Sequence, residues 1–195
     1  MTTATRAAPI LAVLALVTCS TRAPSGSLSP SGDSSPSTSP SPQRFASETY
    51  GYSLTLPKGW IPVQASARWN GKGAPGSEDA VVDQFVGPAA AYSWAYAAST
   101  TSALPAYVKA TIEVTVEDHS DTCPADPVAG DSIQIGGQPG TLLAWNCGVL
   151  VNQAVTVHHG VGFFFGFLDQ SVHAATDATD RKLFLKLLSS VHFAD

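Results

Sequence analysis

Four strand patterns follow one another near the end of the chain, with only short links rich in turn residues between them. The patterns span residues 132–135, 140–147, 149–159 and 161–168, and the links are Gly136-Gly-Gln-Pro-Gly140, Cys147-Gly148 and His159-Gly160. Such links predict consecutive antiparallel strands. The last segment, Val161–Leu168, is apolar on both faces, so we expect it to lie centrally with both sides covered.

Further strands and two helices are predicted from the remaining periodic segments. Residues 50–57 and 80–86 read as strands, and in a third strand Tyr92, Trp94 and Tyr96 alternate with small residues. A helix is expected after Thr101 and Ser102, where apolar residues recur at spacing four, and a second over 177–190, followed by a short strand at 191–193. The expected fold is α+β, an antiparallel sheet of about six or seven strands packed by two helices.

The N-terminus is typical of an export signal. One basic residue, Arg6, precedes an apolar run of about 11 residues from Ala7, which is too short to span a membrane. The run ends at Leu16-Val-Thr-Cys19, similar to a bacterial lipobox, although Thr18 replaces the usual Gly or Ala. We expect residues 1–18 to be a lipoprotein signal and Cys19 to carry the lipid. Ordinary secretory cleavage nearby, with Cys19 incidental, is the alternative.

Composition separates a spacer from a folding domain. Between Ser20 and Arg44, 10 of 25 residues are Ser and 5 are Pro, with Leu28 the single large apolar residue. We expect residues 19–44 to form the anchor and a disordered spacer, and residues 45–195 to form one globular domain. The net charge is −5 and no basic run is present, which argues against nucleic-acid binding.

Three segments resemble known proteins. Phe45-(x)4-Tyr50-Gly-Tyr-Ser-Leu-Thr-Leu-Pro-Lys-Gly-Trp60 resembles the opening strand of PsbP-like domains, and Phe184, Leu187, Leu188 and Ser190-Val-His-Phe193 are similar to their closing helix and strand. Trp69-Asn-Gly-Lys-Gly-Ala-Pro-Gly76, followed by Val82-Asp83, resembles a motif of uncharacterised actinobacterial exported proteins. The resemblance implies an α/β/α sandwich around an antiparallel sheet. Function does not follow from it, because relatives include photosystem subunits, LpqN-type lipoproteins and a nuclear transport cofactor.

Cysteine and histidine positions predict a disulfide and no metal site. With Cys19 lipidated, Cys123 and Cys147 remain, and an oxidising compartment favours their bridge over two free thiols. His158 and His159, adjacent on a predicted strand, are expected to point to opposite faces. Glu117, Asp118, His119 and Asp121 form a polar cluster that either binds a cation or, more commonly, is a solvated helix end.

Catalytic and cofactor motifs are not found. No GxSxG elbow occurs, no two carboxylates stand out as an acid–base pair, and no cofactor is expected. Residues 71–76 match GxGxxG literally, but neither an apolar strand before them nor an apolar helix after them supports nucleotide binding.

The glycine-rich loop from Trp69 to Asp83 is instead predicted as a recognition surface, with Trp69, Lys72 and Asp83 as its candidate residues. The alternative is that Trp69 folds back over the core. We therefore expect a membrane-anchored extracytoplasmic lipoprotein whose non-enzymatic domain binds a protein, lipid or cell-wall component. The rival is an envelope hydrolase with dispersed catalytic residues. The sequence does not indicate an oligomeric state.

Overall fold

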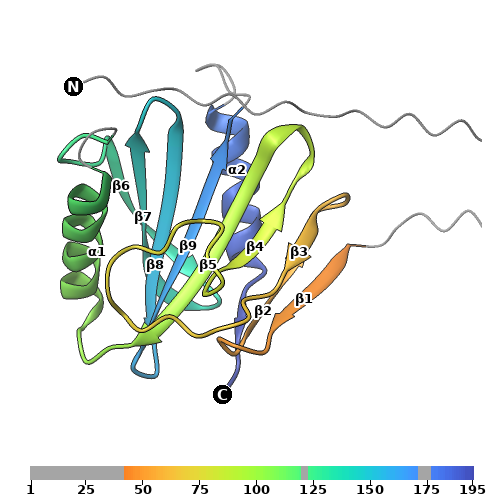
Figure 1. The fold of residues 1–195 in the computed structure, drawn as a ribbon, viewed down its shortest axis with the longest axis horizontal. Coiled ribbons are helices and arrows are strands. Elements are labelled where there is room, and N and C mark those ends of the chain that lie inside the picture. The colour runs from red at the N-terminus through yellow and green to blue at the C-terminus, as the bar shows by residue number, and fades with distance from the viewer. Residues whose placement is uncertain (1–41, 120–122, 171–176) are drawn as a thin grey trace, which may run out of the picture. The chain divides into compact units, whose positions relative to one another are not determined.

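A computed structural model describes residues 42–119, 123–170 and 177–195 of the chain, and every structural statement concerns these residues (Figure 1). Its elements are β1 (Gln43–Ser47), β2 (Tyr52–Leu56), β3 (Ile61–Val63), β4 (Asp83–Val86), β5 (Ala91–Ser99), α1 (Leu104–His119), β6 (Ala129–Ile135), β7 (Gln138–Asn146), β8 (Leu150–His158), β9 (Val161–Asp169), α2 (Asp177–Ser189) and β10 (His192–Phe193).

Two antiparallel sheets are formed. Seven strands pair in the order β3-β4-β5-β9-β8-β7-β6, and a smaller sheet pairs β1-β2-β10. The predicted α+β class, with two helices and an antiparallel sheet of about six or seven strands, is confirmed. The small sheet was not predicted as a separate unit, and it joins the opening strand to the end of the chain, Phe193 pairing with Tyr52.

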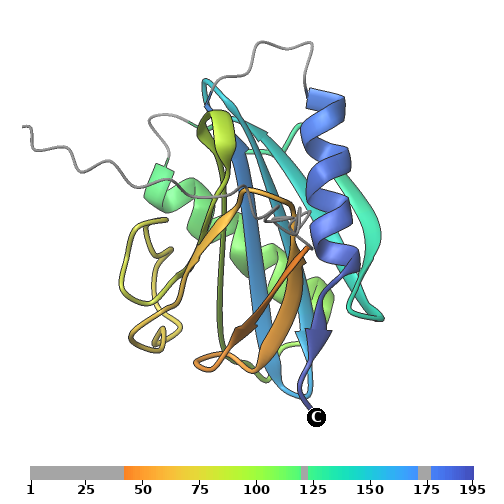
Figure 2. The ribbon, with the colours of Figure 1, turned by 90° about the vertical axis from the view of Figure 1, so that its right-hand side faces the viewer.

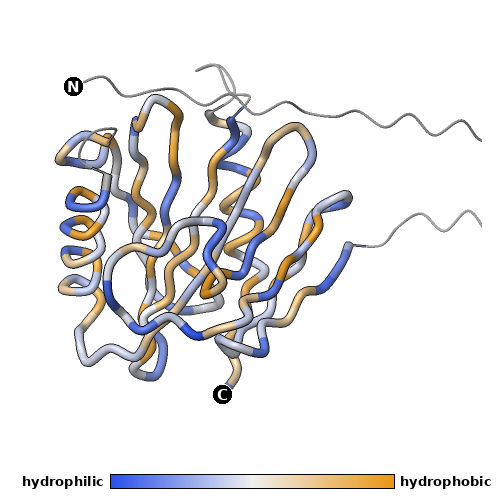
Figure 3. The backbone as a smooth tube through the Cα atoms, in the orientation of Figure 1, coloured by the Kyte–Doolittle hydropathy of each residue, from blue (hydrophilic) through white to orange (hydrophobic). Residues whose placement is uncertain are grey.

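The helices cover opposite faces of the large sheet (Figure 2). Helix α1 packs against β7 and β8, whereas α2 packs against β6, β8, β9 and the β2 strand of the small sheet. Apolar and polar residues alternate along α1 in Figure 3, consistent with a helix that buries only one side. The resulting order of layers is the α/β/α sandwich that the resemblance implied.

Strand β9 is the central element, as predicted from its apolar character. It lies between β5 and β8, and residues 162–167 are buried throughout. On the α2 side, Phe165 meets the ring of Tyr52 and Phe167 stacks on Phe184. On the α1 side, Phe164 stacks on Tyr96 of β5. Alternation along one strand therefore supplies aromatic residues to both cores.

Some features differ from the sequence prediction. Strand β1 (Gln43–Ser47) was not among the predicted strands; it lies at a sheet edge, where exposed polar residues such as Gln43 and Arg44 are tolerated. The prediction that His158 and His159 point to opposite faces is wrong. His159 lies in the turn after β8 with φ +47°, so the strand alternation stops and the two rings stack 4.0 Å apart.

The predicted disulfide is present. Cys123 and Cys147 are bonded, which ties the segment after α1 to the turn between β7 and β8. Neither helix of the described segments is long and apolar enough to cross a membrane.

Candidate functional site

The loop from residue 64 to residue 80 is attached at both of its ends. Ser66 and Ala67 donate their backbone N–H groups to the carbonyl of Ala80, at 2.9 and 3.1 Å. The N–H of Trp69 donates to the hydroxyl of Tyr50 at 3.0 Å. Further along, the Trp69 ring meets Tyr96 of β5 and the Ala74 N–H donates to Asp118 of α1, so the loop lies on the face of the large sheet that also carries α1.

Trp69 is half-buried and packs on strand β5. Its ring meets the ring of Tyr96 edge-on, with centroids 4.7 Å apart, and its indole Nε1–H donates to the carbonyl of Lys72 at 3.0 Å. Gly71 and Gly73 make this turn possible, because their φ values of +81° and +62° are disfavoured for residues with a Cβ. Trp69 therefore closes over the sheet and also borders open space.

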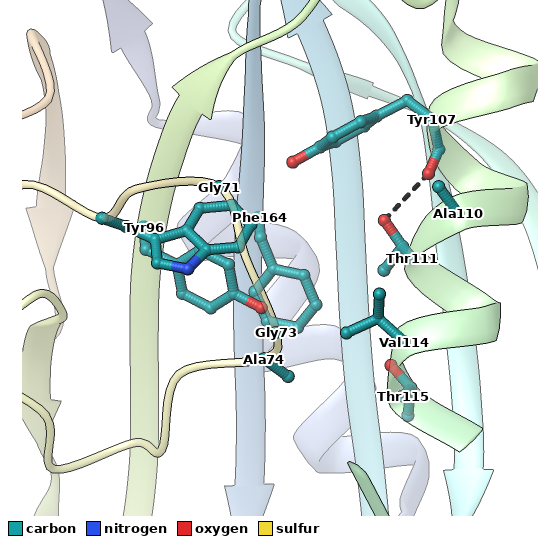
Figure 4. Close-up of a pocket in the computed structure, with 11 residues that line it drawn as sticks. Gly71, Gly73, Ala74, Tyr96, Tyr107, Ala110, Thr111, Val114, Thr115 and Phe164 are labelled. Atoms are coloured by element: carbon teal, nitrogen blue, oxygen red, sulfur yellow. Dashed lines mark hydrogen bonds between the residues drawn. The ribbon is translucent and has the colours of Figure 1, made fainter. Parts of the chain in front are cut away.

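That space, which we call the slot, is a pocket of about 110 Å³ between the loop and α1 (Figure 4). The stacked rings of Tyr96 and Phe164, 4.6 Å apart, bound it on the strand side. The full lining consists of aromatic and small residues, namely Trp69, Gly71, Gly73, Ala74, Tyr96, Tyr107, Ala110, Thr111, Val114, Thr115 and Phe164.

Tyr107 reaches from α1 toward the sheet because β9 has a glycine beneath it. A Cβ at Gly162 would lie 2.4 Å from Cζ of Tyr107, closer than atoms can approach. A glycine inside a strand commonly marks such a close approach. Figure 4 shows the Tyr107 ring reaching from α1 to the strands, with its hydroxyl at the strand end, and the Tyr96 hydroxyl pointing from β5 toward the helix.

Both tyrosines stay protonated at neutral pH. Burial raises the pKa of Tyr107 to about 12. Burial also raises the pKa of Tyr96 well above its ordinary value, and Tyr107 and Asp118 nearby add to the rise. Each hydroxyl is thus a neutral hydrogen-bond donor that can also accept.

Apart from the Trp69 indole, the polar side chains that line the slot are those of tyrosine and threonine. None of its lining residues is Asp, Glu, His, Lys, Arg, Ser or Cys. A carboxylate lies beside the lining residue Ala74: Oδ2 of Asp118 accepts the Ala74 backbone N–H at 2.6 Å and so joins the loop to the end of α1. An arrangement of aromatic walls and neutral hydroxyls of this kind can bind and orient a group.

The three residues predicted for the recognition loop do not lie together. Trp69 lines the slot, and Lys72 contributes its carbonyl to the loop while its side chain is outside the slot lining. The prediction that Asp83 belongs to the recognition surface is wrong. It starts β4 with 0% exposure, and its carboxylate accepts the Tyr52 hydroxyl and the Ala65 N–H, both at 2.8 Å. Burial and these two bonds give Asp83 a structural role and remove it from the recognition surface.

Several other predicted features can be placed. Cys19 lies outside the described residues. In the polar cluster at 117–121, Glu117 is exposed and Asp118 bonds to the loop, while Asp121 lies outside the described residues. Across residues 42–119, 123–170 and 177–195, no three His, Cys, Asp or Glu side chains are grouped to hold a metal ion. Trp60, Trp94 and Trp145 are buried in the core.

Sequence reasoning missed Tyr96, Tyr107 and Phe164 as site residues. The aromatic alternation of β5 was recognised, but it indicated packing only. A larger groove of about 450 Å³ lies between β2 and α2, but no aromatic residue lines it. The slot, which has aromatic walls and tyrosine hydroxyls, is the better candidate site.

No protein-family model matches the chain, and no curated protein matches its sequence. Among solved structures, it is similar to the solution structure of cyanobacterial PsbP (CyanoP) from Synechocystis sp. PCC 6803, with a TM-score of 0.55 and 17% identity, over 77% of this chain and 91% of that one. A crystal structure from Bacteroides thetaiotaomicron matches with a TM-score of 0.45 and 13% identity, over 79% of this chain and 49% of that one. The structural similarity to CyanoP, together with the two helices and the antiparallel sheet, shows that the domain has the PsbP-like fold.

Proposed function

We propose that this chain is an exported accessory protein whose domain binds an uncharged group in the slot and performs no catalysis. One observation carries the proposal. The slot combines aromatic walls with the hydroxyls of Tyr96 and Tyr107, and no ionisable side chain other than these tyrosines lines it. Pockets that are largely apolar, with a few converging polar groups, are typical ligand sites.

The proposal includes a membrane anchor on Cys19. Its support is in the sequence, where Cys19 directly follows the apolar run and precedes the Ser/Pro spacer. A diacyl anchor would hold the protein at the outer face of the cell membrane, because two acyl chains bind stably where one binds marginally. Replacing Cys19 with Ala should release the protein from the membrane fraction, and equal retention of both forms would contradict the anchor.

The binding site is tested by filling the slot. Ala110 is exposed on α1 and lines the slot, so Ala110→Leu should obstruct it while leaving the helix intact. Ala106→Leu is the matched control, since Ala106 is also exposed on α1 but does not line the slot. Both substitutions keep good helix formers.

Binding is measured on the mature chain, residues 19–195 with Cys19→Ala, by following the indole N–H resonances of its four tryptophans. Acetophenone, a small uncharged ring compound, should shift the Trp69 resonance saturably in the parent and in Ala106→Leu, and should not do so in Ala110→Leu. Equal binding by both variants would place the ligand elsewhere. Turnover of a generic ester, phosphate monoester or peptide would refute the non-enzymatic part.

A further inference from the structure

We infer that the slot selects a flat, uncharged ring that bears an acceptor oxygen, with the hydroxyls of Tyr96 and Tyr107 as the donors that recognise this oxygen. The inference rests on the proposed function and names the chemical class of its ligand. Three observations support it: two slot hydroxyls have no hydrogen-bond partner among the described residues, the surroundings of the slot disfavour charged ligands, and the slot has the size and shape of one ring.

The hydrogen-bonding capacity of the slot lies in these two hydroxyls. Other polar side-chain atoms of the lining are engaged: Trp69 Nε1 with the Lys72 carbonyl, Thr111 Oγ1 with the Tyr107 carbonyl at 2.9 Å, and Thr115 Oγ1 with Gln153 at 3.4 Å. The Tyr96 and Tyr107 hydroxyls, by contrast, bond to no residue in the described parts of the chain. Tyr96 is only 5% exposed, and its hydroxyl faces the slot.

The charge around the slot disfavours anions. The Asp118 carboxylate lies at its rim, where it holds the Ala74 N–H, and no cationic side chain lines the slot. A cation would find no carboxylate within the slot itself. Both phenols keep their protons at neutral pH, because burial raises the pKa of each. They can therefore donate to a neutral oxygen without a counter-charge.

The shape of the slot favours one ring. Its volume is about 110 Å³, and its strand side is the pair of near-parallel rings of Tyr96 and Phe164, which are inclined by 10°. For comparison, an apolar protein cavity of about 150 Å³ binds benzene. Aromatic walls also prefer flat partners that stack or meet them edge-on. A single ring, open to solvent on one side, fits these limits.

A ring without oxygen would bind less tightly. It would cover the two hydroxyls and leave them unpaired, and sites built to hydrogen-bond a ligand oxygen reject analogues that lack it. The expected discrimination is about tenfold or more in Kd.

The test uses a matched pair of probes, acetophenone and ethylbenzene, which differ by a carbonyl oxygen, together with benzoate as the charged analogue. Each is titrated into the mature chain with Cys19→Ala while the Trp69 indole resonance is followed. Acetophenone should bind about tenfold more tightly than ethylbenzene, and benzoate should fail to compete. Tyr96→Phe and Tyr107→Phe should each reduce this preference. Tyr92→Phe is the control and should keep it, because the Tyr92 hydroxyl lies outside the slot and donates to the Ser77 carbonyl at 2.5 Å.

The outcomes separate the two proposals. If neither neutral probe binds, the proposed function fails. If both bind with equal Kd, or if benzoate binds more tightly, the slot is a ligand site but the inference is wrong. A tenfold preference that survives both Tyr96→Phe and Tyr107→Phe, in variants with unchanged melting temperature, would also overturn it, since the hydroxyls would not be its source.

Discussion

Gly162→Ala tests whether the slot is built on a glycine of β9. An added Cβ would lie 2.4, 2.6 and 2.8 Å from Cζ, Cε2 and Oη of Tyr107, so the ring would have to move. Overpacking of this kind costs about 1–3 kcal/mol. Gly162 has no positive φ, so its strand conformation suits Ala, and the reduced entropy of the unfolded chain returns about 0.4–1 kcal/mol. We expect a net loss of about 1–2 kcal/mol in the free energy of unfolding.

The measurement is urea unfolding of four proteins: the parent, Gly162→Ala, Tyr107→Ala and the double variant. In the Tyr107→Ala background the added methyl meets no ring, so the cost of Gly162→Ala should largely disappear. Gly130→Ala is the control, because its Cβ would lie an ordinary 3.8 Å from Leu143. If Gly162→Ala costs the same in both backgrounds, or no more than Gly130→Ala, Tyr107 does not pack on β9 as described.

Three further predictions concern the loop, the tyrosines and the disulfide. Asp118→Ala removes the acceptor of the Ala74 N–H, so hydrogen exchange of the Ala74 amide should speed up. Asp118→Asn keeps an acceptor oxygen and should have less effect. Equal Ala74 exchange rates in the parent and in Asp118→Ala would argue against the loop–helix bond. In the folded protein the pKa of Tyr107 is raised to about 12, so the stability gained from its protonated hydroxyl is complete below about pH 10 and is lost as pH rises through 12. The melting temperature should therefore fall above pH 10, and it should fall less steeply in Tyr107→Phe. The double variant Cys123→Ser and Cys147→Ser, which opens a loop with a sequence separation of 24, should lose about 3 kcal/mol in urea unfolding, and an unchanged midpoint would contradict this.

Most of the fold could be predicted from local sequence patterns. Each strand from β6 to β9 was predicted within a few residues, because short glycine-containing links leave adjacent antiparallel pairing as the simple solution. The alternation of Tyr92, Trp94 and Tyr96 placed β5 for the same reason, since a strand sends successive side chains to opposite faces. The limit appeared at His159, where one residue of positive φ ends the alternation.

The slot could not be predicted in this way, because it is assembled from distant segments. Trp69, Tyr107 and Phe164 come from a loop, a helix and a strand, and no local periodicity relates them. Nothing in the local pattern of 161–168 indicates that Gly162 leaves room for the Tyr107 ring of a distant helix. Asp83 was misplaced for a similar reason. A carboxylate beside a polar loop is usually solvated, and its buried partner Tyr52 is 31 residues away.

Two sequence motifs that seemed independent prove to be parts of one structural unit. The opening motif supplies Tyr50 and Tyr52, and the loop motif supplies Trp69 and Asp83. The Tyr50 hydroxyl accepts the Trp69 N–H and donates to the Val81 carbonyl, while the Tyr52 hydroxyl donates to Asp83. Two tyrosines spaced by one residue thus hold both ends of the loop whose tryptophan closes the slot. Since burial raises the pKa of Tyr52 well above its ordinary value, this hydroxyl keeps its proton and can donate to Asp83 at physiological pH. The glycine-rich loop is therefore positioned by the first strands of the fold, which explains how so irregular a segment can hold Trp69 in a defined place against Tyr96.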